Sequence, residues 1–88
     1  MSPTTYNNMI SKLPAADRKA VGVLEKKMRD SQEFVSKTCD FLLGKIGKDA
    51  VKHFKSMSEE NKVEACVGHI TIGMLSGDIR RRDIEKIV

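Results

Sequence analysis

The chain has 88 residues and a net charge of +4, with 40% apolar residues, 32% charged residues, one tyrosine, three phenylalanines and no tryptophan. This balance fits one globular domain over residues 1–88, because the chain is too short for two cores and too apolar for a disordered polymer. Its sequence contains neither a secretion signal nor an apolar run that could cross a bilayer, so we expect a cytoplasmic protein with reduced cysteines.

The first predicted element is a short helix over about residues 3–12. Ser2 is a typical N-cap, and Pro3 is well tolerated in a first turn. The helix ends at Leu13 and Pro14, because a residue before proline avoids the helical region and proline itself opens a new helix well.

The second predicted element is one long helix from Ala15 to about residue 43. Its apolar residues recur at steps of three, four and seven, the period of one helical face. They are Val21, Leu24, Met28, Val35, Cys39, Leu42 and Ile46. Such a helix of about 29 residues would be ~44 Å long at 1.5 Å per residue. We expect it to be the central helix of the fold and the surface of a homodimer, since a short chain with a thin aliphatic core gains stability by self-association.

A short helix over about 48–56 is predicted next. Gly44 and Gly47 stand where the long helix should end, and glycine readily takes the left-handed conformation that closes helices. Val51 and Phe54 form the inner side of this short helix.

Two more helices complete the chain. Ser58 is followed by acidic residues and then by an apolar face, which predicts a capped helix as far as Ser76. Gly77 ends that helix, and Asp78 is expected to cap a last helix over 79–88.

Residues 67–73 admit a second interpretation, because their β-branched side chains also suit a strand. A strand would need a partner, and the sequence offers no convincing one, so we predict helix. Small side chains there indicate a low-relief surface that another helix can approach closely: Ala65, Gly68, Ile72 and Gly73. The predicted fold is therefore all-α, a small bundle of four or five helices with one long central helix.

The basic segment 42–55 is the main functional candidate, and it is not a phosphate-binding loop. The Walker pattern needs GxxxxGK followed by Ser or Thr, so that amides wrap the phosphates and the hydroxyl reaches magnesium. Here Leu42 stands five residues before Gly47, and Asp49 stands where the hydroxyl belongs. We interpret the glycines of this segment as helix ends.

The lysines of this segment form what we call the lysine ridge, Lys45, Lys48, Lys52 and Lys55. Steps of three, four and three place them on one side if the helical path is nearly continuous. The ridge would match successive phosphates or an acidic protein surface, and four phosphate contacts would weaken binding about a hundredfold between 50 and 200 mM salt. The alternative is a solvated face opposite Val51 and Phe54.

Arg80, Arg81 and Arg82 are the second basic cluster. Consecutive helical residues point in three directions, so some of these side chains face solvent or a partner. Arginine forms bidentate pairs with phosphate or carboxylate, which suits specific contacts. The alternative is pairing within the helix with Asp78, Asp83 and Glu85.

Other chemistries find little support. A helix-turn-helix starting from Ala65 would need glycine where His69 stands. Cys39, His53, Cys66 and His69 supply zinc-ligand types, but their spacing does not resemble a paired knuckle. Both cysteines fall on predicted buried faces, where thiols stay protonated and unreactive. We therefore predict no catalysis, no metal and no cofactor.

The predicted function is non-catalytic binding of a polyanionic partner, such as RNA, DNA or a nucleotide-bearing complex. The lysine ridge would carry the binding, helped by Arg80 to Arg82, and an isoelectric point near 9.2 supports it. The alternative is a protein-binding inhibitor or adaptor that acts through an apolar helix face, since the chain has more apolar faces than it can easily bury.

Overall fold

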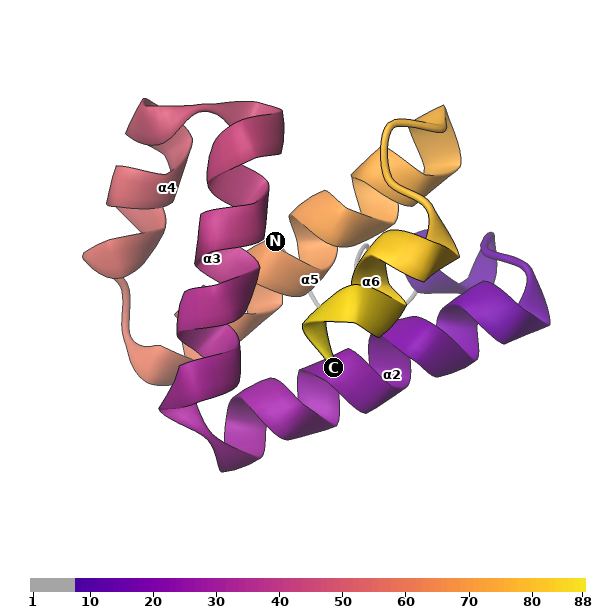
Figure 1. Cartoon of the computed structure of the whole chain (residues 1–88), viewed down its shortest axis with the longest axis horizontal. Coiled ribbons are helices and arrows are strands. Elements are labelled where there is room, and N and C mark those ends of the chain that lie inside the picture. The colour runs from indigo at the N-terminus through magenta and orange to yellow at the C-terminus, as the bar shows by residue number, and fades with distance from the viewer. Residues whose placement is uncertain (1–7) are drawn as a thin grey trace.

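A computed structural model describes residues 8–88 of the chain. Its labelled helices are α2 (Ala15–Asp30), α3 (Gln32–Ile46), α4 (Lys48–Lys55), α5 (Glu59–Ser76) and α6 (Arg81–Ile87) (Figure 1). Residues 8–11 are also helical, and this agrees with the end of the helix predicted over 3–12. The predicted start of that helix at Ser2 and Pro3 lies outside the described residues. The all-α class is confirmed, and residues 67–73 are helical.

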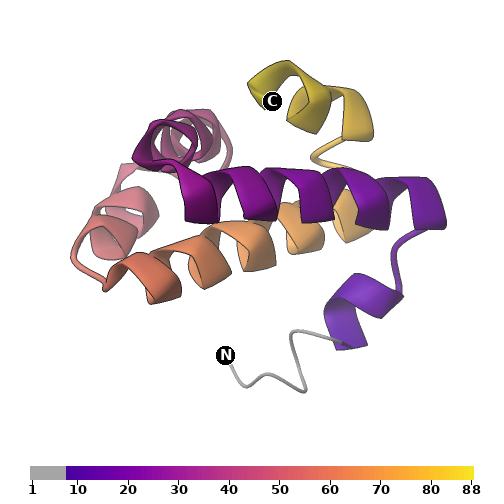
Figure 2. The same ribbon diagram turned by 90° about the horizontal axis from the view of Figure 1, so that it is seen from below.

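The helices pack around one core. α2 and α5 lie side by side and run in opposite directions (Figure 2), while α6 packs against α2 and also contacts α3. α3 and α4 cover one end of this pair, and α3 lies between α4 and α6 (Figure 1). The most deeply buried apolar side chains, all 0% exposed, come from α2, α3, α5 and α6. They are Leu24, Leu42, Cys66, Val67, Ile70 and Ile84.

Among residues 8–88, the buried polar side chains are those of two threonines, and each has a hydrogen-bond partner within its own helix. The hydroxyl of Thr38 donates to the carbonyl of Phe34 at 2.8 Å, and that of Thr71 donates to the carbonyl of Val67 at 2.8 Å. Since burial of an unpaired hydroxyl would cost free energy, these bonds let the two threonines be fully buried.

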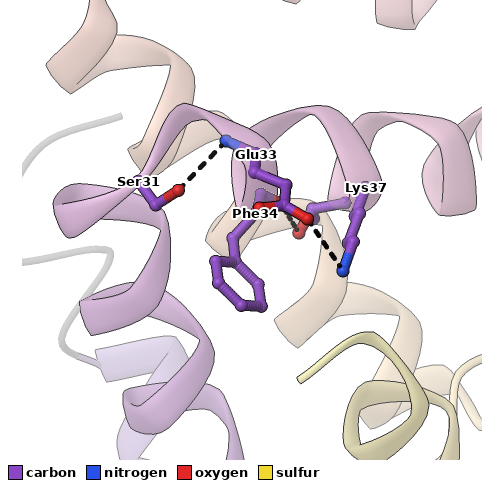
Figure 3. A network of polar contacts seen from close by, with 5 residues as sticks. Ser31, Glu33, Phe34 and Lys37 are labelled. Carbon is purple, nitrogen blue, oxygen red and sulfur yellow. Dashed lines mark hydrogen bonds and ion pairs between the residues drawn. The ribbon is translucent and has the colours of Figure 1, made fainter.

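The single long helix predicted from Ala15 to about residue 43 is wrong, because the chain breaks at Ser31. Ser31 has extended backbone angles, φ −148° and ψ 127°. Its Oγ accepts a hydrogen bond from the backbone N–H of Glu33 at 3.3 Å, so it caps α3 (Figure 3). The six helices of the described chain exceed the predicted four or five for this reason.

The sequence did not predict this break, because the apolar pattern continues across it. Residues 29–33 are all polar, yet the seven-residue step from Met28 to Val35 keeps both side chains in phase with one helical face. Both are buried in the same core although they belong to different helices. The predicted homodimer interface required this long helix, and the structure has two shorter helices, α2 and α3, in its place.

The ends of α4 and α5 agree with the prediction. Gly47 has φ 94° and ψ 165°, a positive-φ conformation that favours glycine, and α4 follows it directly. Gly44, also predicted to end a helix, instead lies inside α3, which continues beyond it. The Oγ of Ser58 accepts from the backbone N–H of Asn61 at 3.4 Å and caps α5. Gly77, with φ 89°, ends α5 in the left-handed conformation.

The last helix begins at Arg81 rather than at residue 79, and Asp78 is not its cap. The Asp83 carboxylate accepts a hydrogen bond from the backbone N–H of Arg80 at 3.0 Å, which makes Arg80 the capping position. The hydrogen bond lowers the pKa of Asp83 below its ordinary value. Ile79 stays outside the helix because its side chain, 3% exposed, enters the core.

At Gly73, one residue of the predicted low-relief surface, the neighbour is this extended segment. The backbone N–H of Ile79 donates to the carbonyl of Gly73 at 3.0 Å. A Cβ on Gly73 would lie 2.7 Å from Cγ1 of Ile79, so only glycine leaves room for that side chain. Ile72 faces away and is 47% exposed.

Candidate polyanion interface

α4 presents three lysines on one exposed face, which we call the lysine face: Lys48, Lys52 and Lys55. Their steps of four and three place them on one side of the helix. Val51 and Phe54, 3% and 4% exposed, bury the other side in the core and hold α4 in place. Asp49 in the first turn and Lys52 and Lys55 in the last turn also suit the helix dipole.

The lysine face carries unbalanced positive charge. None of its three ammonium groups makes an ion pair or hydrogen bond with another residue of the 8–88 segment. Some other lysines of the described chain are engaged, such as Lys37, which pairs with Glu33 at 3.4 Å (Figure 3). Further lysines likewise have ammonium groups with no ion pair or hydrogen bond within residues 8–88, but they do not form one face of a single helix: Lys12, Lys19, Lys26 and Lys86. The charges of the lysine face are therefore available to a partner.

A groove runs between α3 and α4 beside the lysine face. Its wider part encloses about 270 Å³, and the lysine face, Asp40, Leu43 and Val51 line it. A narrower part of about 120 Å³ continues along α3 toward α5, with Gln32, Val35, Cys39 and Lys62 among its lining residues. Asp40 and Lys55 line both parts, so we treat them as one α3–α4 groove.

Lys45 does not share the lysine face, so the lysine ridge is not continuous. Their alignment required a nearly continuous helical path, and Gly47, with φ 94° and ψ 165°, interrupts that path between Lys45 and Lys48. Lys45 instead donates from Nζ to the backbone carbonyl of Asp78 at 3.1 Å, and its ammonium lies 5.9 Å from the ring centroid of Phe41. Lys45 thus contacts the connection between α5 and α6.

The arginine cluster lies apart from the lysine face. Arg80, Arg81 and Arg82 are exposed at the start of α6, and α3 separates α6 from α4 (Figure 1). Arg81 forms ion pairs with Glu85 at 3.3 Å and with Asp17 of α2 at 3.9 Å. Such exposed pairs contribute little stability, about 0–1 kcal/mol. Of the predicted site residues, the structure brings together the three α4 lysines alone.

Several residues of the groove were missed by sequence reasoning, among them Asp40, Leu43 and Lys62. Leu43 carried a signal, since it is apolar but lies outside the helical stripe, and it is 44% exposed. Asp40 and Lys62 carried none. Lys62 comes from α5 and pairs with Glu59 at 3.6 Å, so only the packing of α5 against α3 and α4 brings it to the groove.

The two cysteines meet in the core between α3 and α5. Their Sγ atoms are 3.9 Å apart, and both side chains are buried. Burial, followed by the neighbouring Cys39 thiol, raises the pKa of Cys66 to about 12. Burial also lowers the pKa of His69, whose ring centroid lies 5.0 Å from that of Phe54. These environments favour neutral side chains.

We expect the buried Cys66 thiol to react slowly with alkylating reagents. Only the thiolate reacts, and its fraction at a given pH falls about tenfold for each unit of pKa. At pH 8 folded Cys66 should react at least ~100-fold more slowly with iodoacetamide than in guanidinium, as peptide mapping by mass spectrometry would measure. Equal rates in both solvents would contradict the burial of this thiol.

A second, more apolar groove lies between α2 and α6. Its walls include Ala16, Ala20, Val23, Ile84 and Val88, and Lys19, Arg81 and Glu85 form its charged edge. Val23 and Val88 remain 42% and 40% exposed. The alternative function, a protein-binding inhibitor or adaptor, requires an accessible apolar surface, and this groove provides one.

Comparison with known protein families, curated proteins and solved structures gives no significant match. No helix within residues 8–88 combines the length and the apolar character needed to cross a membrane. In the same part of the chain, no three His, Cys, Asp or Glu side chains gather where they could hold a metal ion.

Proposed function

We propose that this protein is a non-catalytic binding protein that engages a polyanionic partner through the lysine face of α4. One observation carries the proposal: three exposed ammonium groups with no intramolecular partner in the described chain lie along the α3–α4 groove. Their spacing matches a ligand that repeats negative charge, and their field would speed its association. RNA, DNA, a nucleotide-bearing complex and an acidic protein segment all have this chemistry.

The proposal of a non-catalytic role rests on the state of the nucleophiles. A thiol needs a lowered pKa or an adjacent base to attack a substrate, whereas burial raises the pKa of Cys66. The Phe54 ring packs against His69 in the same region. A buried thiol and a partly buried neutral imidazole are better suited to filling the core than to chemistry.

The test is charge reversal on the lysine face. Lys48→Glu/Lys52→Glu should weaken polyanion binding at least tenfold, because two of three attractive charges become repulsive. The matched control is Lys12→Glu/Lys26→Glu, which reverses two exposed lysines that line neither groove. Both variants change the net charge equally, so a difference between them reports position rather than total charge.

Fluorescence anisotropy with labelled RNA, duplex DNA and a glutamate-rich peptide would measure the dissociation constants. With three phosphate contacts to the duplex, wild-type affinity should fall about 40-fold between 50 and 200 mM salt. The proposal is wrong if no probe binds, or if the two charge-reversed variants bind equally well.

The alternative, a protein-binding inhibitor or adaptor, is favoured by the α2–α6 groove with its exposed Val23 and Val88. We propose it as the second candidate, with a partner helix that presents an apolar stripe as the ligand. Binding of that kind would survive high salt and the lysine reversals, and Val23→Asp would weaken it. The same variants thus separate the two candidates.

A further inference from the structure

We infer that the polyanion is an acidic amphipathic helix of a partner protein, seated in the α3–α4 groove. Its acidic residues would face the lysine face, and its apolar residues would cover Leu43. This inference rests on the proposed polyanion binding and names the class of partner.

The apolar lining of the groove favours an amphipathic partner. Leu43 is 44% exposed, although its neighbour Leu42 is fully buried. Leu43 and Val51 line the wider part of the groove together with the three lysines. An apolar surface beside cations is complementary to a helix that carries apolar and acidic residues on adjoining faces. A phosphate backbone has no apolar group to place there.

The length of the groove along α3 corresponds to about three helical turns. The lining residues of α3 run from Gln32 to Leu43, which corresponds to ~16 Å at 1.5 Å per residue. The lysine face follows the i, i+4, i+7 spacing on α4. Acidic residues at the same spacing on a partner helix would repeat at the same distances, so each could meet one ammonium group.

The negative charge of Asp40 disfavours a nucleic acid in this groove. This exposed carboxylate lines both parts of the groove, where it would repel an uninterrupted row of phosphates. A peptide can place a lysine or a hydroxyl opposite that one position. In addition, no aromatic ring is among the described residues that line the groove, so bases would find nothing to stack on.

The experiment compares three labelled probes on the full chain by fluorescence anisotropy. The first is an 18-residue helical peptide of glutamate, alanine and leucine, with leucines along one face and glutamates spaced i, i+4, i+7 beside them. The second has the same composition in an order that destroys the leucine stripe. The third is an 18-nucleotide RNA.

Leu43→Ser tests the apolar contact, and Leu75→Ser is its matched control. Leu75 is 45% exposed, as Leu43 is, but it lies near the end of α5 and does not line the groove. Neither side chain belongs to the buried core, so both variants should fold, and circular dichroism would verify their helicity.

We expect the amphipathic peptide to bind at least tenfold more tightly than the scrambled peptide and the RNA. Leu43→Ser should weaken that binding about fivefold, whereas Leu75→Ser should leave it unchanged. Equal affinity for the two peptides, or no effect of Leu43→Ser, would overturn the inference. If RNA bound most tightly and charge reversal abolished its binding, the inference would fail while the proposed polyanion binding stood. If no probe bound, both would fail.

Discussion

Replacing Leu42 with alanine is expected to lower the free energy of unfolding by about 3 kcal/mol. Leu42 is 0% exposed and belongs to the core cluster that joins α3 to the other helices. Truncation removes buried methyl groups and leaves a cavity that the close-packed neighbours cannot fill completely. For a domain of this size, the same loss would lower the melting temperature by more than about 10 °C.

Leu43→Ala is the control, because it makes the same chemical change one residue away. Leu43 is 44% exposed, so its truncation removes far less buried surface and should cost less than about 1 kcal/mol. Urea denaturation followed by circular dichroism would measure both values, with the slope of the transition showing whether the variants unfold in the same way. Equal losses for Leu42 and Leu43 would mean that α3 is rotated relative to the orientation described above.

This pair also shows what the sequence could predict about α3. The apolar period correctly places Leu42 and Cys39 on the buried face, because every helix of a small domain must bury one stripe. The ends of α5 were equally predictable, since Ser58 and Gly77 act through local hydrogen bonds and backbone conformation. Such features depend on near neighbours in the chain, which the sequence contains in full.

The errors arose where tertiary packing decides between local alternatives. At Ser31 an uninterrupted helix and a capped break have the same apolar period, and the packing of α2 and α3 against α5 selects the break. At Asp78 a local cap was available, but the burial of Ile79 moves the start of α6 to Arg81. Local preference is a weak guide when a buried side chain competes with it.

The candidate site follows the same division. Lys48, Lys52 and Lys55 could be grouped from spacing because one helix carries them. Lys45 could not be separated from them by spacing alone, since the positive-φ backbone of Gly47 ends α3 and redirects the chain before α4. The groove itself could not be predicted from the sequence. Asp40 and Leu43 come from α3 and Lys62 from α5, and these helices meet α4 only in the folded state.

The contact between Gly73 and Ile79 leads to the second large effect: Gly73→Ala should destabilise the fold by about 2 kcal/mol. Alanine normally stabilises a helix interior by up to about 1 kcal/mol relative to glycine, so the sign itself is informative. Here the new Cβ would lie 2.7 Å from Cγ1 of Ile79. The segment cannot simply move away, because the N–H of Ile79 donates to the Gly73 carbonyl at 3.0 Å and the side chain is buried.

A double-mutant cycle isolates this overlap. Ile79→Ala removes the atoms that the new methyl group would strike, at a cost of about 3 kcal/mol for the lost burial. In that background Gly73→Ala should be neutral or stabilising by up to about 1 kcal/mol, since only its helix preference remains. Urea denaturation of the four proteins would give a coupling energy of about 2–3 kcal/mol. If the two changes in the free energy of unfolding were strictly additive, Ile79 would not pack on Gly73. The burial of Ile79 would then not explain why α6 begins at Arg81.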